Sequence, residues 1–158
     1  MRRKERESTK EQASLWLKEC EYAVLCMTDP DGRPYGVPVS PVLAGNTVYF
    51  HCAPAGKKLE CIRHEPEVCL VCAAGVIPIP EQFSTAYHST IAFGRAAVVE
   101  DTAEKIAALR LICEKYAASN MENFERETER SLPRTMIVKI ELSDFTGKQK
   151  KLPGEKAL

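Results

Sequence analysis

The strongest indications of the fold lie in residues 35–66, YGVPVSPVLAGNTVYFHCAPAGKKLECIRHEP. The first half of this stretch predicts two strands, residues 35–43 and 47–52, joined by a tight three-residue turn. Pro38 and Pro41 cannot donate a backbone hydrogen bond, which places the first of these strands at a sheet edge or at bulges. Two strands joined by so short a turn are antiparallel, so this stretch predicts an antiparallel sheet.

The second half of the stretch, GKKLECIRHEP at residues 56–66, predicts a helix. Leu59 and Ile62 fall on neighbouring turns, and Pro66 ends the pattern. Outside this stretch we expect helices at 9–20, 103–117 and 121–131, strands at 22–28, 67–75, 84–100 and 135–145, and a proline-rich loop at 76–82. Ser8 with Glu11, Asp101 with Thr102, and Gly94 are the expected capping box, helix cap and strand bulge.

The order of these elements predicts a mainly β fold with flanking helices. The first three strands are joined by short turns, and the chain lacks the regular alternation of strand and helix that a parallel sheet needs. A small antiparallel barrel with helices on its outside fits this order. The 158 residues suit one domain, which we expect to span 1–146, followed by a charged C-terminal tail at 147–158.

Composition argues against several classes of protein. The 22 basic and 22 acidic residues cancel, whereas nucleic-acid-binding proteins usually carry a basic excess. No apolar run reaches the length of a membrane span, and the charged N-terminal segment is not followed by an apolar signal segment. The seven cysteines are odd in number, so reduced thiols are expected rather than a disulfide framework. We therefore expect a cytoplasmic protein with no nucleic-acid or membrane partner.

Lys57 and Lys58 occupy the first turn of the predicted helix, where the positive end of the helix dipole makes cations unfavourable. A bound phosphate would reverse this penalty, because the backbone amides, the dipole and both ammonium groups would then attract the same anion. The alternative is a solvated pair of lysines on an exposed turn. The GxxxxGK[ST] pattern of a P-loop is absent.

Two further groups of residues could carry chemistry. His51 and Cys52 end a predicted strand one short loop before the lysines, although an ordinary half-buried strand end would look the same. Cys69 and Cys72 form a C-x-x-C pair, but residues three apart on a strand point to opposite faces and cannot chelate one zinc ion. No Ser-His-Asp or paired-carboxylate arrangement is evident, and Ser89 reads as an ordinary strand residue.

Three segments, DGRPYGVPVSPV, VYFHCAPAGKKL and YHSTIAFGRAAVVED, resemble in this order and spacing the Nim-related proteins of the pyridoxamine 5′-phosphate oxidase-like superfamily. The resemblance covers roughly residues 1–145. It implies a six-stranded antiparallel split barrel, the FMN-binding split barrel, which forms a homodimer with FMN in a groove at the subunit interface. The FMN-binding residues that it implies are Val37, Pro38, Val39, Ser40, His51, Cys52, Lys57, Lys58 and Ser89.

Within this set the resemblance assigns the flavin ring to residues 37–40 and the phosphate to Lys57 and Lys58. It implies a flavin-dependent reductase of small planar acceptors, nitro-aromatic compounds among them, with His51 as the catalytic residue. The C-terminal aromatic segment with which pyridoxamine 5′-phosphate oxidases bind their substrate is absent, so a different substrate is expected. The alternative is a non-catalytic module of the same fold that binds flavin, or haem through His51, His64 or His88.

Overall fold

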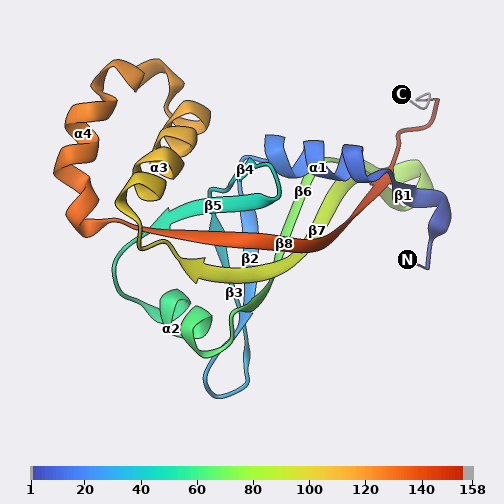
Figure 1. Cartoon of the computed structure of the whole chain (residues 1–158). Helices are drawn as coiled ribbons and strands as arrows, with labels where there is room; N and C mark the ends of the chain where they lie inside the picture. The colour runs from blue at the N-terminus through green and yellow to red at the C-terminus, as the bar shows by residue number, and fades with distance from the viewer. Residues whose placement is uncertain (1, 155–158) are drawn as a thin grey trace.

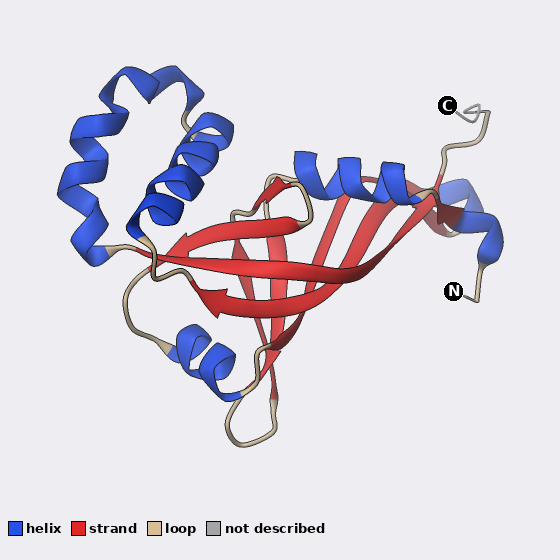
Figure 2. Cartoon of the chain, viewed as in Figure 1, coloured by secondary structure: helices blue, strands red, loops and turns tan. Residues whose placement is uncertain are grey.

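A computed structural model describes residues 2–154 as an antiparallel sheet with flanking helices (Figures 1 and 2). The eight strands run in the order β3-β2-β6-β7-β8-β5-β4, with β1 paired to β8. Their bounds are β1 Glu7–Ser8, β2 Ala23–Thr28, β3 Pro34–Val39, β4 Val42–Ala44, β5 Thr47–Cys52, β6 Glu67–Ile79, β7 Ser84–Val98 and β8 Met136–Lys150. Six of these strands have six residues or more, while β1 and β4 are short additions.

The sheet curls because its two edge strands are neighbours in the sequence. β3 and β4 stand at opposite ends of the strand order, yet only Ser40 and Pro41 separate them. The sheet therefore bends until its ends approach each other, and the chain itself crosses the remaining gap. Lys115 Nζ and Tyr116 Oη both donate to the Pro41 carbonyl, at 2.8 Å each, which fixes this crossing. The expected antiparallel split barrel is confirmed, with the β3 edge where the prolines indicated.

Helices cover the ends and one outer face of the barrel. They are α1 Lys10–Glu19, α2 Lys57–His64, α3 Thr102–Tyr116 and α4 Phe124–Ser131, with short 3-10 turns at Lys4–Arg6, Pro80–Gln82, Ala118–Asn123 and Leu132–Arg134. α1 and α2 lie at opposite ends of the barrel, and α3 and α4 form a lobe beside it (Figure 1). No helix in residues 2–154 has both the length and the apolar character that crossing a membrane requires.

Strand alternation divides the core into two layers. Phe50, Val138 and Ile140 point into the barrel, where they meet Leu17 of α1 and Leu59 of α2. Residues of the opposite parity point outward beneath the helical lobe. This outer cluster consists of Val42, Val99, Ala108, Leu109, Ile112, Phe124 and Ile137. The barrel interior is thus closed by two helices, and α3 and α4 are held by a separate apolar contact.

Several expected boundaries differ from the structure. The capping box of α1 uses Thr9 and Gln12, one position after the expected Ser8 and Glu11. Asp101 caps α3 as expected, because its side chain accepts a hydrogen bond from the Glu104 amide at 2.7 Å. The expected strand at 35–43 is interrupted at Ser40, so β3 and β4 are separate strands.

Two segments expected to be irregular are strands. The loop predicted at 76–82 is wrong for its first half, because β6 continues to Ile79 after a bulge between Ala74 and Ile77, where Gly75 adopts a φ of 59°. β8 continues to Lys150 because it pairs with both β7 and β1, so the charged segment from residue 147 begins inside a strand. The last part of the expected tail, 155–158, lies outside the described residues.

Candidate functional site

A pocket of about 260 Å³ lies where β3, the end of β5 and the start of α2 meet. Tyr35 and Val37 face it together because alternate residues of a strand share a face. Cys52 faces it from β5, next to the inward-pointing Phe50. The complete lining is Tyr35, Val37, Cys52, Ala53, Ala55, Gly56, Lys57, Lys58 and Leu59. One wall is therefore apolar and aromatic, and the other carries two ammonium groups.

The loop into α2 requires glycine at residue 56. Gly56 has a φ of 132°, a backbone conformation that L side chains rarely adopt. Its carbonyl accepts the amides of Leu59 at 3.0 Å and Glu60 at 3.3 Å, which starts the helix immediately after the loop. Since Gly56 has no side chain to cap the helix, the first turn of α2 presents its positive dipole end to the pocket. Lys57 and Lys58 stand in that turn.

Lys57 is paired with a buried carboxylate. Its Nζ lies 3.0 Å from Asp29 Oδ2 and 4.9 Å from the Tyr35 ring centroid, and only 2% of the Asp29 side chain is exposed. Asp29 also accepts the backbone amides of Asp31 at 3.0 Å and Arg33 at 2.8 Å. The Arg33 amide first, and then Lys57, lower the pKa of Asp29 to about 2. Asp29 therefore stays ionised and holds Lys57 against the Tyr35 ring.

Lys58 is the second cation at the pocket. Its Nζ lies 5.2 Å from the Phe50 ring centroid, and its charge acts on both residues at the end of β5. Desolvation, and then the positive charge of Lys58, lower the pKa of His51. Desolvation raises the pKa of Cys52, although Lys58 and Arg63 oppose that rise. Near neutral pH, His51 is thus a neutral imidazole and Cys52 a protonated thiol.

The structure gathers part of the residue set that the sequence singled out. Val37, Cys52, Lys57 and Lys58 line the same pocket. The other members lie around it or elsewhere: Val39 is buried in the core, Pro38 and Ser40 are exposed at the β3 edge, His51 is exposed beside Cys52, and Ser89 lies in β7 opposite Ala73 and Lys148.

Sequence reasoning missed two residues at this site. Tyr35 is detectable in principle, since it stands two positions before Val37 and so shares its face. Asp29 gives only the signal of a turn residue in DPDGRP, because an aspartate there commonly bonds its own backbone. Its pairing with Lys57 spans 28 positions and becomes visible only once the β2–β3 turn and α2 are packed together.

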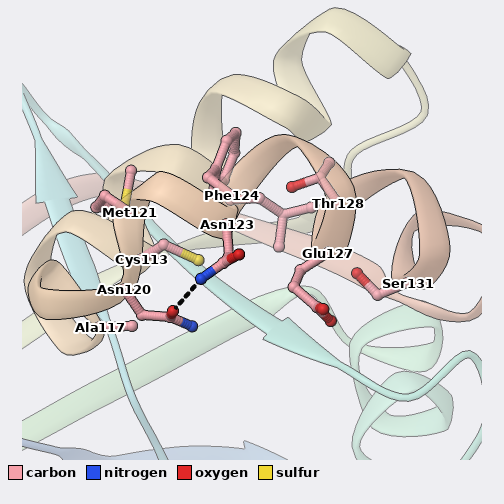
Figure 3. Close-up of a pocket in the computed structure, with 10 residues that line it drawn as sticks. Cys113, Ala117, Asn120, Met121, Asn123, Phe124, Glu127, Thr128 and Ser131 are labelled. Atoms are coloured by element: carbon pink, nitrogen blue, oxygen red, sulfur yellow. Dashed lines mark hydrogen bonds between the residues drawn. The ribbon is translucent and has the colours of Figure 1, made fainter.

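Two other hollows have a different character. One of about 450 Å³ lies at the end of α1, where the rings of Trp16 and His88 stack with centroids 4.8 Å apart. Another, of about 90 Å³, lies between α3 and α4, with Met121 and Phe124 among its lining residues (Figure 3). The first carries carboxylates rather than lysines, and the second has room for only a few water molecules. Neither combines paired cations with a helix N-terminus.

Comparisons with known proteins agree with this architecture. The chain is similar to a candidate 5-nitroimidazole antibiotic resistance protein from Bacteroides thetaiotaomicron, with a TM-score of 0.76, 22% identity, and coverage of 90% of this chain and 84% of that one. It is similar to an FAD- and haem-binding protein from Mycobacterium smegmatis (TM-score 0.80, 18% identity, coverage 96% and 77%). It is also similar to a flavocytochrome from Azotobacter vinelandii (TM-score 0.69, 21% identity, coverage 94% and 71%). Identities this low establish a shared fold only.

No curated protein matches the sequence. The family model described as pyridoxamine 5′-phosphate oxidase, in contrast, matches residues 9–149. This range contains β2 to β7, all of β8 except its last residue, α2 and every residue that lines the pocket between β3 and β5. The chain belongs to the pyridoxamine 5′-phosphate oxidase family.

Proposed function

We propose that the pocket between β3 and β5 binds FMN and that the protein is a flavin-dependent reductase of small planar acceptors. The single observation that carries this proposal is the joint placement of Lys57, Lys58 and the first turn of α2 at one pocket. These three cationic features would hold a phosphate dianion. Asp29 pairs with Lys57 and also with Arg33, which in turn pairs with Asp31. Lys58 and the backbone amides of α2 would therefore supply most of the attraction for the phosphate.

The remaining walls suit a flavin ring. Tyr35 and Val37 offer aromatic and aliphatic surface, and the adjacent residues 38–40 of the exposed β3 edge would supply backbone carbonyls to the ring. The family relationship supports this assignment, as does the fold shared with a protein that binds FAD and haem. A phosphate at Lys57 and Lys58 and a flavin ring along β3 would explain why the lysines and the β3 residues line the same pocket.

We further propose that the protein is a homodimer with the flavin between the two copies. A pocket of about 260 Å³ is smaller than the roughly 300–1,000 Å³ of typical sites for such ligands, so one chain encloses the flavin incompletely. The tip of the β6–β7 hairpin also carries exposed apolar residues: Val76 is 62%, Ile77 46% and Phe83 100% exposed. A second copy would cover this apolar tip, which lies at the opposite end of β6 from the pocket.

The chain's residues have defined roles in the proposed reaction. When bound, the flavin supplies two-electron transfer between a donor and an acceptor. Lys57 and Lys58 fix the phosphate and hence the position of the ring. His51, neutral near pH 7 because its pKa is lowered, would donate a hydrogen bond to the acceptor and is the proposed catalytic residue. The similar fold of the Bacteroides protein makes nitro-aromatic compounds the first acceptors to test.

Removing both lysines tests the phosphate assignment. We expect Lys57→Ala combined with Lys58→Ala to weaken FMN binding about a hundredfold, since each lost charge-assisted contact costs about 1.5 kcal/mol. Riboflavin lacks the phosphate, so its affinity should be nearly unchanged. Flavin fluorescence titration measures both affinities.

The exposed lysines Lys4 and Lys18 lie outside the pocket and give a matched double-alanine control. The control should bind FMN like the wild type. Equal loss of FMN and riboflavin in the Lys57/Lys58 variant, or no loss of either, would contradict a phosphate site at these lysines.

The fold shared with an FAD- and haem-binding protein and with a flavocytochrome favours one alternative, a non-catalytic flavin- or haem-binding module. His88 is the best-placed iron ligand for this alternative, because it lines the hollow of about 450 Å³ beside Trp16. An absorption spectrum separates the two ligands, since haem gives one intense sharp band and flavin a double band in the blue. Turnover of a nitro-aromatic acceptor separates a reductase from a binding module.

A further inference from the structure

The two cysteines of the C-x-x-C motif belong to different pairs on opposite faces of β6. Cys72 points into the core and is only 4% exposed, next to Cys20, which is 6% exposed. The interaction between these two thiols raises the pKa of Cys20 and lowers that of Cys72, and Cys20 Sγ also donates a hydrogen bond to the Leu17 carbonyl at 3.1 Å. Cys69 points outward, where it stands directly opposite Cys26 of β2. The motif therefore contributes one thiol, Cys72, to a buried pair and the other, Cys69, to a pair at the surface.

The outer pair has the spacing that a disulfide needs. Cys26 and Cys69 are register partners in antiparallel strands, so their side chains lie on the same face. Directly opposite residues in such a ladder have Cα atoms about 4.5 Å or 5.5 Å apart, depending on the hydrogen-bonding pattern. Disulfides span Cα separations of about 4.4–6.8 Å. A disulfide also needs Cβ atoms about 3.5–4.5 Å apart, a separation that directly opposite residues approach at the closer, non-hydrogen-bonded type of position.

The outer pair is also accessible. Both thiols are free and half-buried, and both line a surface hollow of about 320 Å³. Phe93 of β7, itself 48% exposed, forms part of the wall, and Glu67 is the charged residue of the lining. A small reagent can therefore reach either sulfur from solvent, whereas Cys20 and Cys72 are only 6% and 4% exposed, although Cys20 lines the hollow beside Trp16.

We propose that Cys26 and Cys69 form an accessible dithiol site that takes small-molecule disulfides as its substrate. In the first step, the thiolate of one cysteine attacks the disulfide, forms a mixed disulfide and releases one small thiolate. In the second step, the other cysteine attacks the protein-bound sulfur, the Cys26–Cys69 bond forms and the second small thiolate leaves. The two protons lost by the cysteines go to the two released thiolates. The protein is oxidised by two electrons and the small disulfide is reduced to two thiols.

The product would link β2 to β6, one strand away from the β3 edge. Cys26 is the register partner of Gly36, which lies between the pocket residues Tyr35 and Val37. Neither the β2–β6 register nor the surface hollow requires a bound flavin, so a bond between Cys26 and Cys69 would form whether or not flavin binds.

Thiol mapping after treatment with excess glutathione disulfide tests this proposal. Remaining thiols are alkylated, the protein is digested, and the peptides are identified by mass spectrometry with and without reduction. We expect the wild-type protein to lose two alkylatable thiols and to give one linked peptide pair joining Cys26 to Cys69. Cys26→Ser and Cys69→Ser should each abolish that pair, and either variant suffices if the other folds poorly.

Cys113 provides the matched control, because it is also free and half-buried but lies on α3, away from the pair. Cys113→Ser should form the linked pair as the wild type does. A glutathione adduct that persists on Cys26 or Cys69 without linkage overturns the proposal. Recovery of both thiols unreacted, or a linked Cys20–Cys72 pair in place of the expected one, overturns it as well.

Discussion

At Gly94, β7 and β8 approach so closely that there is no room for a side chain. The register of β7 against β8 shifts between Phe93 and Gly94, where the sequence predicted a bulge. A Cβ atom at Gly94 would lie 2.4 Å from the Glu141 carbonyl oxygen and 2.9 Å from Ile140 Cγ2. Both neighbours belong to the central strand β8, so neither can move without disturbing the barrel.

We expect Gly94→Ala to reduce the free energy of unfolding by about 3 kcal/mol, at the upper end of typical overpacking costs. In a domain of this size that corresponds to a fall in Tm of about 10 °C. Gly36→Ala is the matched control, because its Cβ would meet only Val24 Cγ1, at the ordinary contact distance of 3.4 Å. Thermal unfolding followed by circular dichroism compares the two, and equal Tm values would refute the close contact at Gly94.

Residue by residue, the sequence located the cations of the site but not the group that orients one of them. Lys57 and Lys58 could be found because lysines in a first helical turn violate a local rule and so suggest a ligand. Asp29 violates no local rule, since turn aspartates are common. For Ser89 and His51, the sequence predicted the local structure but not the position relative to the pocket. Their strand positions were predicted, but the distance of each from the pocket depends on how the sheet curls.

At the scale of elements, Asp29 connects the β2–β3 turn to the start of α2. Its carboxylate accepts backbone amides within the turn and the Lys57 ammonium of the helix. Its pKa in the folded protein, about 2, lies below the usual value near 3.9 in an unfolded chain. The ionised form is thus favoured by folding, and the stabilisation is present above pH 4 and lost as the pH falls towards 2.

We expect Asp29→Asn to remove this part of the acid sensitivity. The variant should be less stable than the wild type at pH 6, and the difference should shrink as the pH falls from 4 to 2. Asp31→Asn is the control, because Asp31 pairs with Arg33 at the surface with 69% of its side chain exposed. Urea unfolding across this pH range measures both differences, and a constant gap for Asp29→Asn would contradict the linkage.

The two strands that are longer than predicted share one cause. β6 and β8 extend beyond their predicted ends because β7, at 15 residues, offers both of them partners along its whole length. The proline-rich residues 76–79 and the lysine-rich residues 147–150 have weak strand character by themselves. Pairing with a long neighbour supplies the hydrogen bonds that the local sequence does not predict. Helix positions, in contrast, followed from caps and apolar spacing within each segment.

For the whole molecule, the proposed homodimer is the assembly to test. Phe83 is fully exposed and has a φ of 47°, a left-handed conformation that is unusual for a bulky residue. We expect the wild type to sediment at micromolar concentration with twice the chain mass of 17.6 kDa. Phe83→Asn should weaken the dimer roughly tenfold or more without harming the monomer, because asparagine tolerates this backbone conformation.

Leu15→Asn is the control for this experiment, since Leu15 is also an exposed apolar residue (48%) but belongs to α1 rather than to the hairpin tip. Its dissociation constant should match that of the wild type in sedimentation equilibrium. A wild type that remains monomeric with FMN bound would refute the dimer. Equal weakening by both substitutions would instead exclude the tip as its interface.

The architecture as a whole was predictable because several local signals agreed. Short turns implied antiparallel pairing, two prolines implied an edge, and the family resemblance implied the split barrel. The curl itself could not be read from local patterns. It follows from the topology, in which the chain passes from one edge of the sheet to the other across Ser40 and Pro41.

The prolines of the β3 edge also affect how readily the protein aggregates in a crowded solution. An unpaired strand ordinarily offers its hydrogen-bonding groups to any extended peptide and can seed aggregation. Pro34 and Pro38 remove amide donors from β3, so an incoming strand finds no continuous ladder to join. The backbone carbonyls of β3 remain as hydrogen-bond acceptors, and the proposed flavin ring would use only a few of them. The protein can therefore leave this rim uncovered beside the proposed flavin pocket without inviting fibril growth.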